Sequence, residues 1–432
     1  MPTAQAASRT RYKVLALCLM LAGITYLDRI CISITRPAMQ KDLGLSDTQM
    51  GWVFAAFQLA YGIFEIPTGH WGDTLGTRRV LTRIVAWWSA FTVMTAGAFN
   101  YASLLGIRFL FGIGEAGAWP NVARTFSRWF PLHERATVQG IFFMGAHLAG
   151  GLTPLLVTWL LTFLPWRAIF VLFGCLGMFW ALWWYRWFRD EPSEHAEVSA
   201  EERALIEHGR VVGARHELNW ARWKELLGNA SVLGLCGMYF TQSYGFAFNV
   251  YWLPKYLKES RGITDPWLFG ILAGLPLTFA VAADLFGGLT ADRLSRRYGV
   301  RAGRVIVGFA SLLLAGLFLI AGVWVSDAYA SAVLIGLSGA MGAFLLGAAW
   351  STCLDIGGNH AGVVSAAMNT AGQVGAFLCP LVIPYSTQAL GSMTAGVYLV
   401  GVLYLLGALC WLAVDPTKPI WRDAEGSAVS HG

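Results

Sequence analysis

The chain has 432 residues, of which 56% are hydrophobic and only 13% charged, and its formal net charge is +6. A globule of this length needs more polar residues to cover its surface in water. The composition therefore excludes a water-soluble protein and predicts one that is embedded in a membrane.

Twelve apolar segments follow one another along the chain, each long enough to cross the ~30 Å hydrocarbon core of a bilayer as a helix. They cover residues 14–35, 50–71, 80–99, 103–124, 137–162, 166–187, 230–253, 267–290, 304–325, 329–352, 361–385 and 392–414. A polar stretch separates the sixth segment from the seventh. The sequence therefore predicts an all-α polytopic membrane protein, with 12 transmembrane helices in two six-helix halves.

We place the N-terminal six-helix half at residues 1–188, a cytoplasmic linker at 189–229, the C-terminal six-helix half at 230–415 and a cytoplasmic tail at 416–432. Within the linker, Ser199-Ala-Glu-Glu202 has the spacing of a capping box and predicts a short amphipathic helix.

Most lysines and arginines lie in the segments that share a side of the membrane with the N-terminus. Because cytoplasmic loops carry an excess of these residues, both termini are expected in the cytoplasm, in a multi-pass protein of the cell (inner) membrane. This bias accounts for the net charge of +6 without a nucleic-acid partner.

Four charged residues interrupt the apolar segments: Asp28 and Arg29 in the first, and Arg108 and Glu115 in the fourth. Charges at such depth are costly and commonly mark an ion or substrate pathway. Arg108 and Glu115 are seven residues apart, which places them on one helix face about 10.5 Å apart. We expect a cavity lined by these groups, with static structural ion pairs (Asp28 with Arg29, Arg108 with Glu115) as the alternative.

No motif of enzyme or cofactor chemistry is found. The seven cysteines are scattered singly, without the spacing of metal ligands, and there is no phosphate-binding loop or nucleophile elbow. We expect no enzyme activity, no cofactor and no metal.

The two halves contain similar motifs. Gly69-x-x-x-Asp73, followed by Arg78-Arg79, comes after the second segment, and Gly288-x-x-x-Asp292 comes after the eighth, about half the chain later. Two six-helix halves in parallel repeat, with a site between them near the midplane, are typical of one class of secondary transporters.

These loops resemble the signature loops of the major facilitator superfamily. Further motifs are similar to its anion:cation symporters, which include hexuronate and galactonate permeases and the sialic acid and vesicular glutamate carriers. The motifs are Tyr26-Leu-Asp28-Arg29, Arg108-x-x-x-Gly112-x-Gly-Glu115, Trp129-Phe-Pro-x-x-Glu134-Arg135, Trp252-Leu-Pro-x-Tyr-Leu257 and Asp355-Ile-Gly…Gly362…Asn369.

The resemblance implies that Asp28 and Glu115 carry protons, that Arg108 anchors a substrate carboxylate and that Arg29 anchors substrate or couples it to protons. It also implies that Tyr26 and Tyr61 can donate hydroxyl hydrogen bonds to a polyhydroxylated ligand; for both, an ordinary core aromatic is the alternative.

Further candidates for substrate contact come from both halves. Asn369 and Gln373 are one turn apart and could bind ligand hydroxyls or join helices, and Trp350 could wall the site. Tyr244 is more simply explained by packing. His147 stands where many relatives have glutamine, and a neutral hydrogen-bonding histidine is the simpler interpretation. Residues assigned to gating are Asp73, Arg79, Glu65, Asp284 and Asp292.

The favoured hypothesis is a proton-coupled symporter that imports a small organic anion, with sugar acids (hexuronates or aldonates) as the preferred class, and that works as a monomer in the lipid bilayer. A facilitator or an exchanger of organic acids is the alternative among transporters. A transporter-like receptor or a membrane enzyme is the alternative from another class.

Overall fold

The structure is a computed structural model that describes residues 8–207, 225–226, 228–357 and 361–420, with the side chains of Asp73 and a few neighbouring residues outside the described part. It confirms the predicted class, an all-helical membrane protein with the 12-helix arrangement. Eight of the described helices are long and apolar enough to span a membrane by these criteria alone.

The first half is built from α1 to α7. Their bounds are Thr10–Leu43 (α1), Asp47–Leu75 (α2), Thr77–Thr95 (α3), Tyr101–Glu115 (α4), Ala118–Trp129 (α5), Leu132–Leu160 (α6) and Trp166–Trp187 (α7). Local caps define the turns: Gly44 ends α1 in the left-handed conformation, and the Ser46 side chain begins α2 by accepting the Gln49 N–H.

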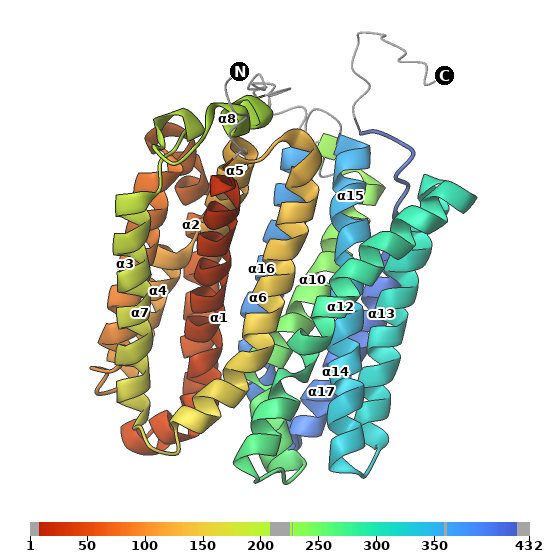
Figure 1. The fold of residues 1–432 in the computed structure, drawn as a ribbon. Helices are drawn as coiled ribbons and strands as arrows, with labels where there is room; N and C mark the ends of the chain where they lie inside the picture. The colour runs from red at the N-terminus through yellow and green to blue at the C-terminus, as the bar shows by residue number, and fades with distance from the viewer. Residues whose placement is uncertain (1–7, 208–224, 227, 358–360, 421–432) are drawn as a thin grey trace.

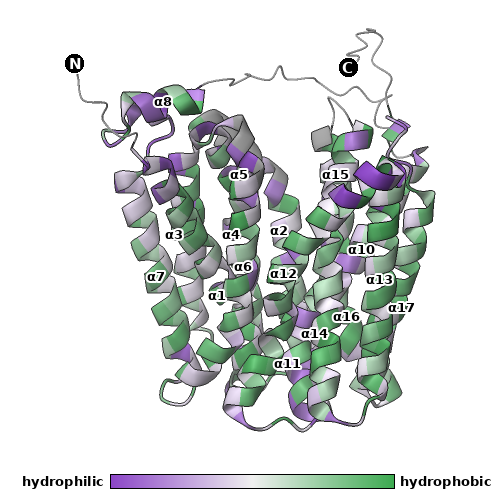
Figure 2. Ribbon diagram, turned by 45° about the vertical axis from the view of Figure 1, so that its right-hand side comes forward, coloured by the Kyte–Doolittle hydropathy of each residue, from purple (hydrophilic) through white to green (hydrophobic). Residues whose placement is uncertain are grey.

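The second half follows a linker that contains the short helix α8 (Ala200–Glu207). Its elements are α10 (Ala230–Tyr251), α11 (Leu253–Lys255), the turn η2 (Tyr256–Ser260), α12 (Pro266–Tyr298), α13 (Val300–Trp324), α14 (Ala328–Phe344), α15 (Leu346–Gly357), α16 (Ala361–Leu390) and α17 (Met393–Cys410). Figure 1 shows the two halves side by side, with α3 and α7 on one outer flank and α13 on the other, and Figure 2 shows α17 beside α13.

Two predicted segments are interrupted. The fourth, residues 103–124, is divided into α4 and α5, because Gly117 adopts a φ of 83° that ends the helical path. The tenth is divided at Leu345 into α14 and α15. The prediction of one continuous helix was therefore wrong in the fourth segment, since apolar composition alone does not reveal a single glycine in the left-handed conformation. The one-residue break at Leu345 keeps a right-handed helical backbone, within an apolar span from Ala328 to Gly357.

Polar residues mark the two ends of the bundle. Figure 2 shows hydrophilic residues gathered at both ends and hydrophobic residues along the spans between them. The start of α1, α8 and the chain after α17 lie at one end, which we call the terminal end. Large apolar side chains such as Phe179, 61% exposed, and Leu412, 61% exposed, project outward from the spans, where lipid would cover them.

The two halves are in close contact toward the opposite end. Helix α6 crosses α12 where Gly274 lies against the Gly151 backbone, and α2 meets α16 where Gly51 lies against Pro380. Lys255 of α11 forms an ion pair with Asp47 of α2 at this end. The bundle is therefore closed at the end opposite the termini.

Candidate functional site

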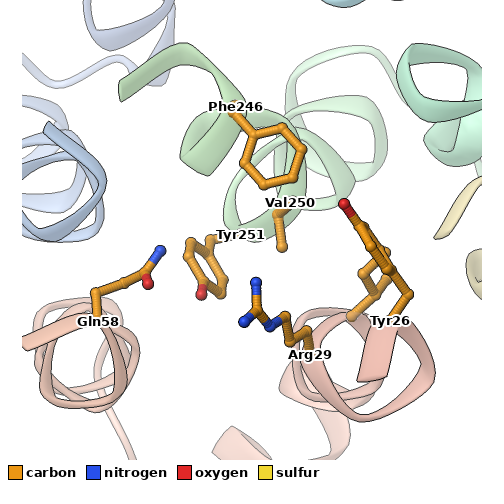
Figure 3. Close-up of a pocket in the computed structure, with 7 residues that line it drawn as sticks. Tyr26, Arg29, Gln58, Phe246, Val250 and Tyr251 are labelled. Carbon is orange, nitrogen blue, oxygen red and sulfur yellow. The ribbon is translucent and has the colours of Figure 1, made fainter. Parts of the chain in front are cut away.

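The centre of the bundle holds a cavity between α1, α2 and α10. Seven residues line it: Tyr26, Arg29, Ile30, Gln58, Phe246, Val250 and Tyr251. Figure 3 shows the Arg29 guanidinium directed into the space between Tyr251 and Tyr26, facing the α10 side chains. Both halves of the chain thus contribute to one pocket that has an arginine at its wall.

Arg29 forms an ion pair with Glu115 of α4 through Nε and Oε1. Glu115 is fully buried, and it is the last residue of α4, just before the break at Gly117. Within the described part of the chain, Arg29 Nη2 and Glu115 Oε2 have no hydrogen-bond partner. The pair therefore keeps one free donor and one free acceptor.

Arg108 lies beside this pair without an ion-pair partner of its own among the described residues. It is 1% exposed, and its Nε and Nη1 make no hydrogen bond in the described structure. Its guanidinium carbon lies 4.0 Å from the centroid of Phe111 and 5.4 Å from that of Phe57. The Phe57 centroid is also 5.4 Å from the Arg29 guanidinium carbon, so one ring lies close to both arginines.

Asp28 is 1% exposed and is neighboured by Trp88 and Thr92 of α3, away from the cavity lining. Over the described residues, neither of its carboxylate oxygens has a hydrogen-bond partner by geometry. Neither of the alternative structural pairs, Asp28 with Arg29 or Arg108 with Glu115, is present. Arg29 instead pairs with Glu115, and neither Asp28 nor Arg108 forms an ion pair with another described residue.

Tyr26 and Tyr61 both lie near Arg29. The Tyr61 ring centroid is 4.8 Å from the Arg29 guanidinium, and Tyr26 lines the cavity itself. The Tyr26 ring also lies edge-on to His147, with the ring centroids 6.2 Å apart.

His147 of α6 meets Asp284 of α12 across the interface between the halves, with Nδ1 and Oδ2 2.5 Å apart. The sequence names His147 as a candidate for substrate contact and Asp284 for gating, whereas the structure brings the two together in one contact. A second polar contact crosses the interface where Asn369 Nδ2 donates to Glu65 Oε2 at 3.0 Å. Gln373 packs one turn away, against Gly62.

Two other candidates lie outside the lining of the cavity. Tyr244 is 2% exposed on α10, and its hydroxyl finds no partner among the described groups. Trp350 is 40% exposed on α15 and lies edge-on to Tyr239 at 6.1 Å.

Asp292 and Arg79, two of the five gating candidates, lie toward the terminal end, whereas Asp284 and Glu65 form the interface contacts with His147 and Asn369. Asp292 accepts from Arg304 of α13 at 3.3 Å, and the same arginine reaches Asp355 of α15 at 3.3 Å. Arg79 is exposed at the start of α3. The side chain of Asp73 lies outside the described residues.

Sequence reasoning missed part of the cavity lining. Gln58 could have been found, because it is a polar residue one turn before Tyr61 in an apolar segment. Tyr251, which directly precedes the Trp252-Leu-Pro motif, carried a similar signal. Phe246 and Val250 have the composition of ordinary core residues, so nothing in the sequence marked them. No group of three or more potential metal ligands occurs among the residues that the structure describes.

A bundle of two similar halves with a charged pocket between them defines a membrane transporter of the repeated-bundle class. The chain belongs to the major facilitator superfamily, whose family model matches residues 18–380. The solved structure of a bacterial homologue of the human lysosomal transporter Spinster, in an inward-facing conformation, shares the fold. Its TM-score is 0.72 at 18% identity, with 94% of this chain and 98% of that chain covered.

Curated relatives extend over nearly the whole chain. A probable sulfoacetate transporter of Cupriavidus necator is 33% identical, with 98% of each chain covered. A hexuronate transporter of Bacillus subtilis is 30% identical over 94% of this chain and 96% of the relative. A probable galactarate/D-glucarate transporter of the same species is 28% identical over 95% and 93%. Family and relatives identify a transport protein and not an enzyme.

Proposed function

We propose that the protein is a proton-coupled symporter that imports a small organic anion by alternating access, with sugar acids as the preferred substrate class. The named substrates of the relatives, which are sugar acids and sulfoacetate, are all organic anions. Arg29 at the cavity wall and the buried Arg108 near it fit this substrate chemistry, because a guanidinium binds a carboxylate or a sulfonate through parallel hydrogen bonds.

The observation that carries the proposal is the ion pair between Arg29 and the buried Glu115 at the edge of the cavity. An anion that enters the cavity competes with Glu115 for the Arg29 guanidinium. Glu115, which is fully buried, then loses its cationic partner in a low-dielectric environment, where an isolated carboxylate is costly. Binding a proton removes that cost, so occupation by the anion and protonation of Glu115 favour each other.

Arg108 and Asp28 extend this arrangement. Arg108 has two unpartnered guanidinium nitrogens within the described structure, so a second acidic or hydroxyl group of the substrate can bind there. Asp28, which has no hydrogen bond to either oxygen in the described part, is the second proton carrier. Tyr26, Tyr61 and the missed Gln58 and Tyr251 supply hydrogen-bonding groups for substrate hydroxyls.

Polar contacts across the interface provide the remaining roles. Asn369 and Gln373 lie next to the cavity helices from the second half, and release of Glu65 would allow Asn369 to bind substrate. His147 and Asp284 hold α6 to α12 and must separate or rotate as the halves move. Asp292, Arg79 and Asp73 belong to the gate at the terminal end.

We place the terminal end in the cytoplasm and the protein in the inner membrane, because the basic residues gather on that side. Closure at the opposite end then leaves the transporter facing inward. One chain contains the whole cavity, so a monomer is sufficient for transport.

The test of the coupling is Glu115→Gln in proteoliposomes. Glutamine resembles the protonated acid, so we expect substrate binding and counterflow exchange to persist while accumulation driven by an inward proton gradient is lost. Glu194→Gln, at an exposed linker position, is the matched control and should accumulate substrate like the wild type. Wild-type accumulation by Glu115→Gln would place the coupling elsewhere, and uptake by the wild type that ignores a protonophore would exclude symport.

The substrate is found by thermal-shift screening of the purified protein against sulfoacetate, D-glucarate, galactarate, D-galactonate and D-glucuronate. A sugar acid is expected to give the largest stabilisation, since a ligand stabilises the native state in proportion to the logarithm of its concentration over Kd. Stabilisation by sulfoacetate alone would replace the sugar-acid class with small sulfonates.

A further inference from the structure

Arg36 is a buried cation that the transport site described above does not use. It follows Arg29 by two helical turns, so both arginines lie on the same face of α1, about 10.5 Å apart along the axis. Arg36 is 2% exposed, and in the described structure its Nε and Nη1 have no hydrogen-bond partner.

The acidic groups nearest Arg36 are engaged elsewhere or face solvent. Asp47 forms an ion pair with Lys255 and accepts a hydrogen bond from Gln40 Nε2 at 3.0 Å. Glu259, with a side chain 57% exposed, lies 3.4 Å from Lys255. Arg36 instead lies over the Trp252 ring, with 5.2 Å between its guanidinium carbon and the ring centroid.

An aromatic layer separates Arg36 from the central cavity. Phe54 of α2 stacks on Tyr251 of α10 with centroids 4.7 Å apart and meets Trp252 edge-on at 6.0 Å. Tyr251 lines the cavity that contains Arg29, whereas the Arg36 guanidinium lies over the ring of Trp252. The layer therefore lies between two arginines of the same helix.

The contact between Arg36 and Trp252 joins the two halves. Arg36 belongs to α1 and Trp252 to the second half, and the Lys255–Asp47 pair also crosses the interface. When the halves separate at this end, the Lys255–Asp47 pair breaks and two cations, Arg36 and Lys255, face a shared opening. A buried guanidinium with unmade hydrogen bonds is costly, and an anion that reaches the opening can make them.

We propose that Arg36 is an entry site for the transported anion, on the outer side of the Phe54–Tyr251–Trp252 layer. It binds the carboxylate or sulfonate of the substrate when the end opposite the termini opens, before the anion passes to Arg29 and Arg108. Lys255 assists once Asp47 releases it. This inference rests on the proposed function, because it requires an anionic substrate that enters from that end.

The experiment compares entry from the two sides of the membrane. Uptake is measured in intact cells, where substrate enters by the end opposite the termini, and in inverted membrane vesicles, where it enters by the terminal end. The probe is whichever of the five acids of the thermal-shift screen the wild-type protein takes up. We expect Arg36→Gln to raise KM about tenfold in cells, as for the loss of one charge-assisted hydrogen bond, and to leave KM in inverted vesicles unchanged.

Two further variants sharpen the comparison. Arg36→Lys keeps the charge and should recover part of the affinity in cells, since an ammonium lacks the planar fork. Lys41→Gln removes an exposed charge from the same end of α1 and should leave both KM values unchanged. Reduced folding lowers Vmax but leaves KM unchanged, because KM does not depend on the amount of active protein. Vmax is normalised to the amount of protein in the membrane.

Three results would overturn the inference. An unchanged KM in cells for Arg36→Gln would show that the anion does not bind there. Opposite changes of KM on the two sides would show that Arg36 sets the balance between conformations. A wild-type protein that takes up none of the five acids would contradict the proposed function itself, and the entry site with it, whereas the first two results leave the proposed function intact.

Discussion

At the scale of single residues, the central ion pair depends on which helix face each charge occupies. Asp28 and Arg29 are adjacent in sequence, but consecutive residues of a helix point about 100° apart. Arg29 consequently reaches the cavity and Glu115, while Asp28 is directed toward α3. Arg108 and Glu115 share a face but are two turns apart, which is too far for a direct bond.

Arg108→Ala tests the anchoring role. The variant should lose substrate binding by a factor of about ten to a hundred, because a carboxylate would lose a charge-assisted partner worth ~1.5 to 3 kcal/mol. Isothermal titration of the purified protein measures the change. Arg108→Lys keeps the charge but lacks the planar fork, so its substrate affinity should lie between those of the wild type and Arg108→Ala. A wild-type affinity for Arg108→Ala would assign this arginine to packing against Phe111 and Phe57.

At the scale of elements, α8 fastens the linker to the first half. The Ser199 hydroxyl accepts the Glu202 N–H at 3.2 Å, as the predicted capping box requires, but the Glu202 carboxylate does not complete the box. It accepts instead from the N–H groups of Thr10 and Arg11, each at 3.1 Å, at the start of α1. Arg11 in turn bonds Glu134 at the start of α6.

Glu202→Ala should therefore destabilise the protein. Glu202 is fully buried, and its removal leaves the first N–H groups of α1 and one bond of Arg11 unmade, at a cost of roughly 2 to 4 kcal/mol. A lowered midpoint of thermal unfolding in detergent would show it. If Glu202→Ala melts like the wild type, the contacts of α8 contribute nothing to stability.

Glu197→Ala in the same linker is the matched comparison. Its ion pair with Lys13 is exposed, so the loss should stay below about 1 kcal/mol. Hydrogen bonds from Lys13 and Trp187 lower the pKa of Glu197 from its ordinary value. Stability from a lowered carboxyl pKa is present above the unfolded-state pKa and is lost as pH falls through the folded-state pKa. The small difference from the wild type should therefore disappear in acid.

The crossing of α6 and α12 depends on glycine. A Cβ at Gly274 would collide with the Gly151 carbonyl oxygen, whereas a Cβ at Gly288 of the same helix would meet nothing within 4 Å. We expect Gly274→Ala to cost about 1 to 3 kcal/mol and to weaken closure at the end opposite the termini. Gly288→Ala should be neutral or stabilising. The midpoints of thermal unfolding of both variants test this expectation. Equal midpoints would show that α6 and α12 can move apart at little cost to accommodate the methyl group.

At the scale of the whole molecule, the orientation that we propose rests on the distribution of basic residues. A fluorescent protein fused after residue 432 should fluoresce, as expected in the cytoplasm. Alkaline phosphatase inserted in the turn near Gly262, between η2 and α12, should be active, as expected on the outer side. The opposite pair of signals would reverse the direction of transport that we propose.

The sequence by itself determined the 12-helix membrane fold and the charged residues that enter it. Both depend on hydrophobic length and on the cost of buried charge, which are properties of local composition. It also located α8, because a capping box is a local signal, and it singled out Asp28, Arg29, Arg108 and Glu115 as charges within the apolar segments.

Only the tertiary structure decided which of these groups meet. The Arg29–Glu115 pair, the His147–Asp284 and Asn369–Glu65 contacts and the aromatic layer over the cavity all join helices far apart in the chain. The break at Gly117 likewise depends on Thr68 of α2, whose side chain fills the space where a Cβ would stand. Such contacts are set by how helices cross and rotate against one another, and no periodicity within one segment encodes the face that a distant segment will meet.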